Sequence, residues 1–115
     1  MKCIIAGSRS ITQYHILDHA IQESGWADEI SQVVSGGARG VDALGEEWAY
    51  KNHRQLIIFP ADWDTYGKSA GIRRNKQMGI WADRLIALHE NNSRGTGHMI
   101  QYMQELKKPI YVLEI

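Results

Sequence analysis

Short apolar runs alternate with helical patterns along this chain. Five short runs are rich in Ile, Val and Leu and apolar on successive residues, at 2–6, 32–34, 56–59, 84–88 and 110–114. Successive apolar residues are typical of strands that are covered on both faces, as in a parallel sheet. The pattern therefore predicts five buried strands.

Between these runs, apolar residues recur every three or four positions, which predicts four helices. The repeats are Tyr14, Leu17 and Ile21; Val41, Leu44 and Trp48; Met78, Trp81 and Ala82; and Met99, Ile100, Met103 and Leu106. Gly25 is expected to end the first helix and Pro109 to stop the last. Because Trp48 and Trp81 fall on apolar helix faces, we expect both in the core.

Alternating strands and helices with short connections predict an α/β fold. We expect a Rossmann-like three-layer sandwich, in which helices cover both faces of a parallel sheet of about five strands. A length of 115 residues suits one domain, 1–115, with a single core. Ligands of such sheets bind outside the carboxyl ends of the strands.

Composition narrows the class of protein. The 13 basic and 13 acidic residues balance, so the chain lacks the cationic field of a general nucleic-acid binder. The single cysteine, Cys3, lies in the first apolar run, and no Cys/His set has zinc-site spacing, so we expect no metal and no cofactor. With no signal peptide or membrane-spanning run, the expected location is the cytoplasm, away from membranes.

Three turns of small residues follow the first, second and fourth predicted strands. Their sequences are Gly-Ser-Arg-Ser at 7–10, Ser-Gly-Gly-Ala-Arg-Gly-Val-Asp at 35–42 and Asn-Ser-Arg-Gly-Thr-Gly at 92–97. Glycines let the backbone approach a phosphate, and the free N–H groups of a following helix point at it. The P-loop Gly-Lys-Ser/Thr is absent, and the spacing departs from the dinucleotide fingerprint. The turns thus predict an anion site of another kind.

Several side chains in these turns have two interpretations. Arg9 and Arg39 could each hold a phosphate through two hydrogen bonds. Asp42 is as suited to offsetting the positive end of its helix as to contacting a ligand. Thr96 is a plausible N-cap for the fourth helix, whereas Gly95 and Gly97 are better explained by close approach of a ligand.

A long connection, 60–71, carries two carboxylates, two aromatic rings and a lysine. Irregular loops of this length usually have a function, so we expect a wall over the binding cleft rather than a plain surface excursion. Trp63 could stack on a base. The basic run 73–76 that follows is either a solvated helix face or part of the site, and His98 could point towards the cleft.

Five blocks of sequence together resemble the SLOG superfamily, which includes Smf/DprA and the Lonely Guy enzymes. The blocks are Gly7–Arg9, Ser35–Asp42, Phe59–Trp63, Arg73–Met78 and Ser93–His98. The resemblance covers nearly the whole chain and is greatest to the compact YspA- and YpsA-related branch of bacteria and phages. It implies a Rossmann-like sheet with a site for a nucleotide, ADP-ribose or a similar phosphoribosyl ligand.

The resemblance also bears on catalysis. In Lonely Guy enzymes an arginine, four residues before a methionine, works with a glutamate after a Gly-Thr turn to cleave a base from ribose 5′-monophosphate. Arg74 and Met78 match the first pair, but Met99 occupies the position of the glutamate, and 91–93 replaces a Pro-Gly-Gly. A thioether cannot act as an acid or a base. The substitution favours binding over cleavage.

We therefore expect a protein that senses or sequesters a nucleotide-derived small molecule, such as an NAD-derived signal held by a phage sponge. The expected ligand-binding residues are Gly7, Ser8, Arg9, Ser35, Gly36, Gly37, Arg39, Gly40, Asp42, Pro60, Asp62, Trp63, Arg74, Asn75, Ser93, Gly95, Thr96 and Gly97. One alternative is a phosphoribohydrolase that uses Arg74 with Asp62, or with Asp64 or Glu90. Binding of single-stranded DNA is weaker, because affinity for nucleic acid follows cationic charge. A small domain gains core by self-association, and superfamily members often dimerise, so a homo-oligomer is expected.

Overall fold

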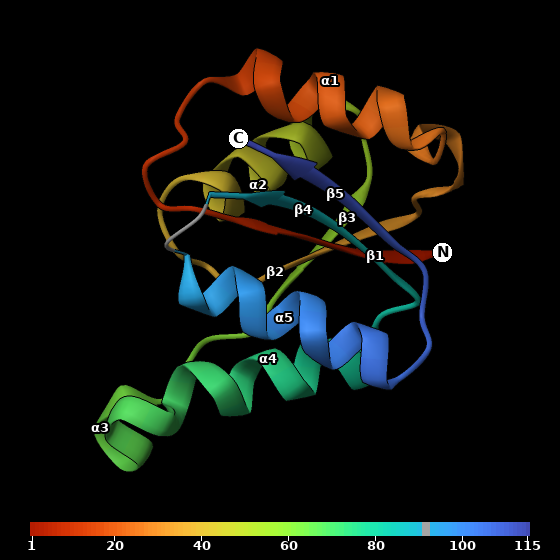
Figure 1. Ribbon diagram of the computed structural model, residues 1–115. Coiled ribbons are helices and arrows are strands. Elements are labelled where there is room, and N and C mark those ends of the chain that lie inside the picture. The colour runs from red at the N-terminus through yellow and green to blue at the C-terminus, as the bar shows by residue number, and fades with distance from the viewer. Residues whose placement is uncertain (91–92) are drawn as a thin grey trace.

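Five parallel strands form a single sheet in the computed structural model, which describes residues 1–90 and 93–115 (Figure 1). The strands are β1 (Lys2–Gly7), β2 (Gln32–Ser35), β3 (Gln55–Ile58), β4 (Arg84–His89) and β5 (Ile110–Glu114). Their order across the sheet is β3-β2-β1-β4-β5, with every neighbouring pair parallel. All five predicted strands are present.

Helices cover both faces of the sheet, which confirms the predicted α/β, Rossmann-like fold. Figure 1 shows α1 (Tyr14–Ser24) and α2 (Val41–Lys51) on one face, and α4 (Ala70–Trp81) and α5 (Arg94–Glu105) on the other. Each face has its own apolar core, built around Trp48 on one side and Met99 on the other. Along the described residues, no helix combines the length and hydropathy that crossing a bilayer requires.

Two expectations about burial are wrong. β3 is an edge strand rather than a covered one, and its Leu56 and Ile58 side chains are 41% and 45% exposed. Trp81 is 43% exposed, because it ends α4 at the rim of the sheet, where polar partners hold it. Its indole donates to Gln32 Oε1 at 2.9 Å, and Lys2 Nζ lies 3.8 Å from the ring centre.

The connection 60–71 is helical, contrary to the expected irregular loop. It holds α3 (Trp63–Tyr66) and a 3-10 turn, η2 (Gly67–Ser69), and α4 then begins at Ala70. The Asp62 carboxylate caps α3 by accepting a hydrogen bond from the Thr65 N–H at 3.1 Å. These short helices bring Trp63 to the carboxyl ends of the strands.

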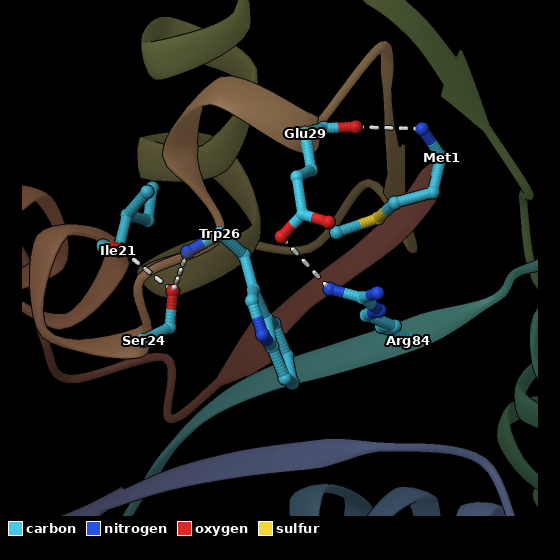
Figure 2. Close-up of polar contacts among 6 residues, drawn as sticks. All are labelled: Met1, Ile21, Ser24, Trp26, Glu29 and Arg84. Atoms are coloured by element: carbon cyan, nitrogen blue, oxygen red, sulfur yellow. Dashed lines mark hydrogen bonds and ion pairs between the residues drawn. The ribbon is translucent and has the colours of Figure 1, made fainter.

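The amino ends of the strands are fastened by contacts that involve the 3-10 helix η1 (Ala27–Glu29). The Glu29 carboxylate lies 3.2 Å from Arg84 Nη1, and the backbone carbonyl of Glu29 accepts from the Met1 amino group at 2.6 Å. Figure 2 shows both contacts. Ser24 Oγ accepts from the Trp26 N–H and donates to the Ile21 carbonyl, which fixes the turn before η1. This edge is thus occupied by structural contacts, and the candidate site lies at the opposite, carboxyl edge.

Candidate functional site

A cavity of about 430 Å³ lies where β1 and β4 end. These two strands are neighbours in the sheet. The chain adds β2 and β3 on the side of β1 and β5 on the side of β4, so the strand order reverses between β1 and β4. The cavity lies at this reversal point, where parallel sheets bind ligands. Its wall combines the end of β1, the start of α2, the segment from α3 to α4, and the first turn of α5. Pockets for small molecules have volumes of roughly 300–1,000 Å³, which includes this one.

A second cavity, of about 400 Å³, adjoins the first. It is lined by the Gly36–Arg39 turn and by residues after β3, including Pro60. Four residues line both cavities: Arg9, Ala38, Trp63 and Arg74. The two spaces therefore meet between two guanidinium groups and one indole.

Positive charge is concentrated around these cavities. The cationic lining residues are Arg9, Arg39, Lys68, Arg74 and Arg94. Among the described residues that line either cavity, Asp42 is the one carboxylate. On a chain with no net charge, such clustering creates a local field that attracts anions.

Arg74 is fixed at the junction by neighbouring groups. Its Nη1 donates to the Gly36 carbonyl at 2.6 Å and its Nε donates to Asn75 Oδ1 at 3.1 Å. A Cβ at Gly36 would lie 2.6 Å from Arg74 Nη1, so glycine permits this close approach, and a larger residue would displace the end of the arginine side chain. Burial lowers the pKa of Arg74, and the neighbouring Asp42 carboxylate opposes that shift.

Asp42 and Ser35 hold the 35–42 turn from its inner side. The Asp42 carboxylate accepts from the Ala38 N–H at 3.2 Å, and Ser35 Oγ accepts from the Gly37 N–H at 3.1 Å. Burial raises the pKa of Asp42, while the Ala38 N–H and then the Arg74 charge act in the opposite direction. Asp42, in the first turn of α2, thus organises the 35–42 turn and lines the first cavity.

The first turn, 7–10, differs from the expected strand–turn–helix arrangement. Since α1 begins only at Tyr14, the N–H groups of this turn are not the first turn of a helix. Ser8 instead accepts from the Val41 N–H at 3.2 Å through its carbonyl, which joins this turn to the start of α2. Ser10 Oγ donates to the Glu90 carboxylate at 2.9 Å, so this carboxylate already has a partner.

The turn before α5 is close to its expected position. The N-cap prediction for Thr96 is wrong, because α5 begins at Arg94 with Ser93 in the cap position. Thr96 is instead buried within the first helical turn, where its hydroxyl accepts from Ser93 Oγ at 2.7 Å. A Cβ on Gly95 would have no neighbour within 4 Å, so the space beside this cavity-lining residue is open. Residues 91 and 92 lie outside the described residues.

The structure brings most of the predicted residues to the two cavities. The first is lined by Gly7, Arg9, Asp42, Trp63, Arg74, Asn75, Ser93, Gly95 and Thr96. The second adds Gly36, Gly37, Arg39 and Pro60. Ser8, Ser35, Gly40, Asp62 and Gly97 line neither. Gly40 has a packing role instead, since it has a φ of 72° and a Cβ there would collide with the backbone of Ser8 and Arg9.

The predicted site residues did not include Lys68 or Ile72, which also line the first cavity. Lys68 lies in the segment 60–71 that we expected to be a wall, and Ile72 follows that segment directly in α4. The sequence pattern singled out the segment but neither residue. His98 does line the cavity, as its place in the first turn of α5 suggested. Within the described part of the chain, no group of three His, Cys, Asp or Glu side chains could hold a metal ion.

Comparison with known proteins agrees with this architecture. The model of the YspA, cpYpsA-related SLOG family matches residues 1–66. The gene 61 protein of Mycobacterium phage D29 is 34% identical over 84 residues, which is 68% of this chain and 67% of that protein.

Two solved structures share the fold, each with a TM-score of 0.74 over 97% of this chain. They are DNA processing protein A from Helicobacter pylori, which binds single-stranded DNA, at 22% identity, and DprA from Streptococcus pneumoniae, at 16%. The chain spans 64% of the first of these chains and 49% of the second.

Proposed function

Because the chain belongs to the YspA, cpYpsA-related SLOG family, we propose that it binds, and so senses or sequesters, a nucleotide-derived small molecule at the carboxyl edge of its sheet. The observation that carries this proposal is the clustering of charge. Five cations and a single carboxylate line the paired cavities within the described residues, although the whole chain is neutral. Guanidinium groups are well suited to binding phosphate through paired hydrogen bonds.

The paired cavities favour a ligand with two lobes. They have similar volumes, about 430 and 400 Å³, and meet at Arg9 and Arg74. A ligand of the ADP-ribose type would place its phosphates between these cations and one sugar-bearing lobe in each cavity. Trp63 lines both cavities and is 52% exposed, so its ring is available to cover a base. A phage protein that sequesters an NAD-derived signal would be one form of this function.

Hydrolysis of a nucleoside monophosphate is the second candidate function, supported by Arg74 and Met78, which both line the first cavity. The buried thioether of Met99 lines the same cavity and supplies no acid or base. Asp62 caps α3 and lines neither cavity, so the carboxylate partner of Arg74 in this mechanism would be Asp42. These placements favour holding the ligand over cleaving it.

Binding of single-stranded DNA is the third candidate, supported by the fold shared with the Helicobacter pylori protein. A cleft lined by five cations could follow a short stretch of nucleic-acid backbone. The size of the two cavities and the balanced charge of the chain favour the small molecule.

One experiment separates these functions. The purified protein is incubated with AMP, ADP-ribose and cyclic ADP-ribose, and the soluble and heat-released fractions are chromatographed. Intact ligand recovered after denaturation, with none consumed, supports binding and excludes the hydrolase, whereas free base that accumulates with turnover contradicts the binding-only proposal. If Arg39→Ala and Arg74→Ala both leave ligand affinity unchanged, the site lies elsewhere.

We also propose that the chain forms a homo-oligomer, a dimer or higher. A domain of 115 residues buries a limited fraction of its surface, and self-association would extend its core. Sedimentation velocity at several protein concentrations measures the assembly state directly. A single monomeric species throughout would contradict this proposal without affecting the ligand site.

A further inference from the structure

The amide of Asn75 has its orientation set from both ends. Arg74 Nε donates to Oδ1 at 3.1 Å, and since a guanidinium only donates, this end must be the amide oxygen. At the other end, Nδ2 donates to the Gly95 carbonyl at 3.2 Å, and a carbonyl only accepts. Asn75 is buried, so these partners determine how its amide lies.

This orientation determines the protonation of His98. Asn75 Nδ2 also lies 3.3 Å from His98 Nδ1, and because an amide nitrogen can only donate, His98 Nδ1 must accept. The imidazole is then neutral, with its single proton on Nε2. Burial, followed by the Lys76 charge, lowers the pKa of His98, while Glu105 opposes the shift.

His98 has a donor left over for a ligand. Its ring lines the first cavity, and among the described residues no hydrogen bond is made by Nε2. The apolar side chains of Met78 and Met99 line the same cavity, and so do the cations Arg9, Lys68, Arg74 and Arg94. Beside these charged donors, which suit phosphate, a neutral imidazole N–H is the donor that suits an uncharged acceptor.

We propose that His98 is a specificity-determining residue, a neutral imidazole whose Nε2–H recognises an uncharged acceptor of the ligand, such as a carbonyl oxygen or ring nitrogen of a base. The base would then lie in the first cavity and the phosphates at the junction beside Arg9 and Arg74. The recognition step rests on the proposed function, but the protonation state of His98 does not.

The protonation state is tested on the ligand-free protein by nitrogen-15 NMR of its imidazole groups. We expect His98 to show a protonated Nε2 and an unprotonated Nδ1 at neutral pH; an Nδ1–H tautomer or an imidazolium overturns the proposal. In Asn75→Asp, a carboxylate oxygen replaces the amide nitrogen opposite Nδ1 and can accept a hydrogen bond from an Nδ1–H group. The proton of His98 should therefore move to Nδ1, or the pKa of His98 should rise. A His98 spectrum unchanged by this substitution contradicts control by Asn75.

Recognition is tested with a matched pair of variants and three probes. The amide nitrogen of Gln in His98→Gln can replace Nε2, whereas that of Asn in His98→Asn replaces Nδ1. We expect His98→Gln to bind AMP and ADP-ribose nearly as tightly as the wild type, and His98→Asn to lose about tenfold or more. Pyrophosphate, which has no base, should bind all three proteins alike.

The outcomes distinguish the two levels of the proposal. The recognition role would be overturned if both variants lost the same affinity for AMP. It would also be overturned if His98→Asn lost as much affinity for pyrophosphate as for AMP. If the wild type binds none of the three probes, the proposed function fails, and the neutral Nε2–H form of His98 is still decided by its NMR spectrum. Thermal unfolding of both variants shows that any loss arises in a folded protein.

Discussion

At the scale of single residues, Gly36 determines how closely Arg74 can approach the 35–42 turn. A methyl group there would lie 2.6 Å from Arg74 Nη1 and 2.9 Å from Asp42 Oδ2. Gly36→Ala should therefore displace Arg74 from the Gly36 carbonyl and lower the affinity for ADP-ribose by about tenfold or more, as loss of a charged hydrogen bond does. Calorimetric titration measures the affinity. Wild-type affinity in this variant would show that Arg74 does not contact the ligand.

Gly95 provides the matched comparison. Its position inside α5 is open, so Gly95→Ala should leave the free protein as stable as the wild type or more stable by up to about 1 kcal/mol. If the ligand fills the space beside Gly95, its affinity should nevertheless fall. Urea unfolding and calorimetric titration of the same variant separate the two effects. Unchanged affinity would place the ligand away from this turn.

Asp42 should make stability depend on pH. In the folded protein the pKa of Asp42 is raised above its ordinary value of 3.8, so folding favours the protonated carboxyl. The resulting contribution to the free energy of unfolding is present in full below the unfolded pKa and is lost as the pH rises through the folded pKa. Relative to Asp42→Asn, the wild type should therefore gain free energy of unfolding as the pH falls from neutral to about 4. Urea unfolding across this range measures the difference. A constant difference, or one with the opposite slope, would contradict the raised pKa.

At the scale of elements, Lys108 holds the end of α4. Its Nζ donates to the carbonyls of Gly79, Ile80 and Ala82 at 2.7, 3.1 and 2.7 Å, which are groups that the end of a helix leaves unpaired. Lys108→Met should lower the free energy of unfolding by about 1–3 kcal/mol. The control is Lys107→Met at the exposed neighbouring position, which should change stability by less than about 0.5 kcal/mol. Equal effects would show that the capping contacts add nothing.

Periodicity was sufficient to locate the strands and the four long helices, because each carries an apolar stripe or run, even where the structure leaves part of it exposed, as in β3. It failed where an element meets the rim of the sheet. Trp81 shares the apolar face of Met78 but lies at the end of α4, beside polar partners from β1 and β2. The four-residue α3 is too short to show a helical period. The residue in the sequence that marks its start is Asp62, which caps the helix.

Most of the residues predicted for the site lie around the two cavities, because three turns at the carboxyl edge must converge in a parallel sheet. Which member of a turn faces the cavity depends on contacts between turns, which no local pattern contains. Ser35 and Gly40, which were predicted to bind the ligand, line neither cavity and instead contact Gly37 and Ser8. The hydrogen bond between Asn75 and His98 is also long-range in sequence, since it joins α4 to α5.

At the scale of the whole molecule, the distribution of charge predicts different salt dependence for a small ligand and for nucleic acid. A chain without net charge has little long-range attraction for a polyanion, and five of its 13 basic residues line the two cavities. A short oligothymidylate should therefore bind weakly near physiological salt. If it uses all five cations, its affinity should fall with salt with a logarithmic slope of about −3 to −4.

The affinity for ADP-ribose should depend less steeply on salt, because it carries few charges and much of its contact is made within the cavities. Fluorescence anisotropy of the oligonucleotide and calorimetry of ADP-ribose, each repeated from low to physiological salt, test this directly. Competition adds a second comparison, since ADP-ribose should displace the oligonucleotide only if both use the junction at Arg9 and Arg74. An oligonucleotide that binds more tightly than ADP-ribose at physiological salt, and that loses affinity in Arg39→Ala and Arg74→Ala, would make the cleft a nucleic-acid interface.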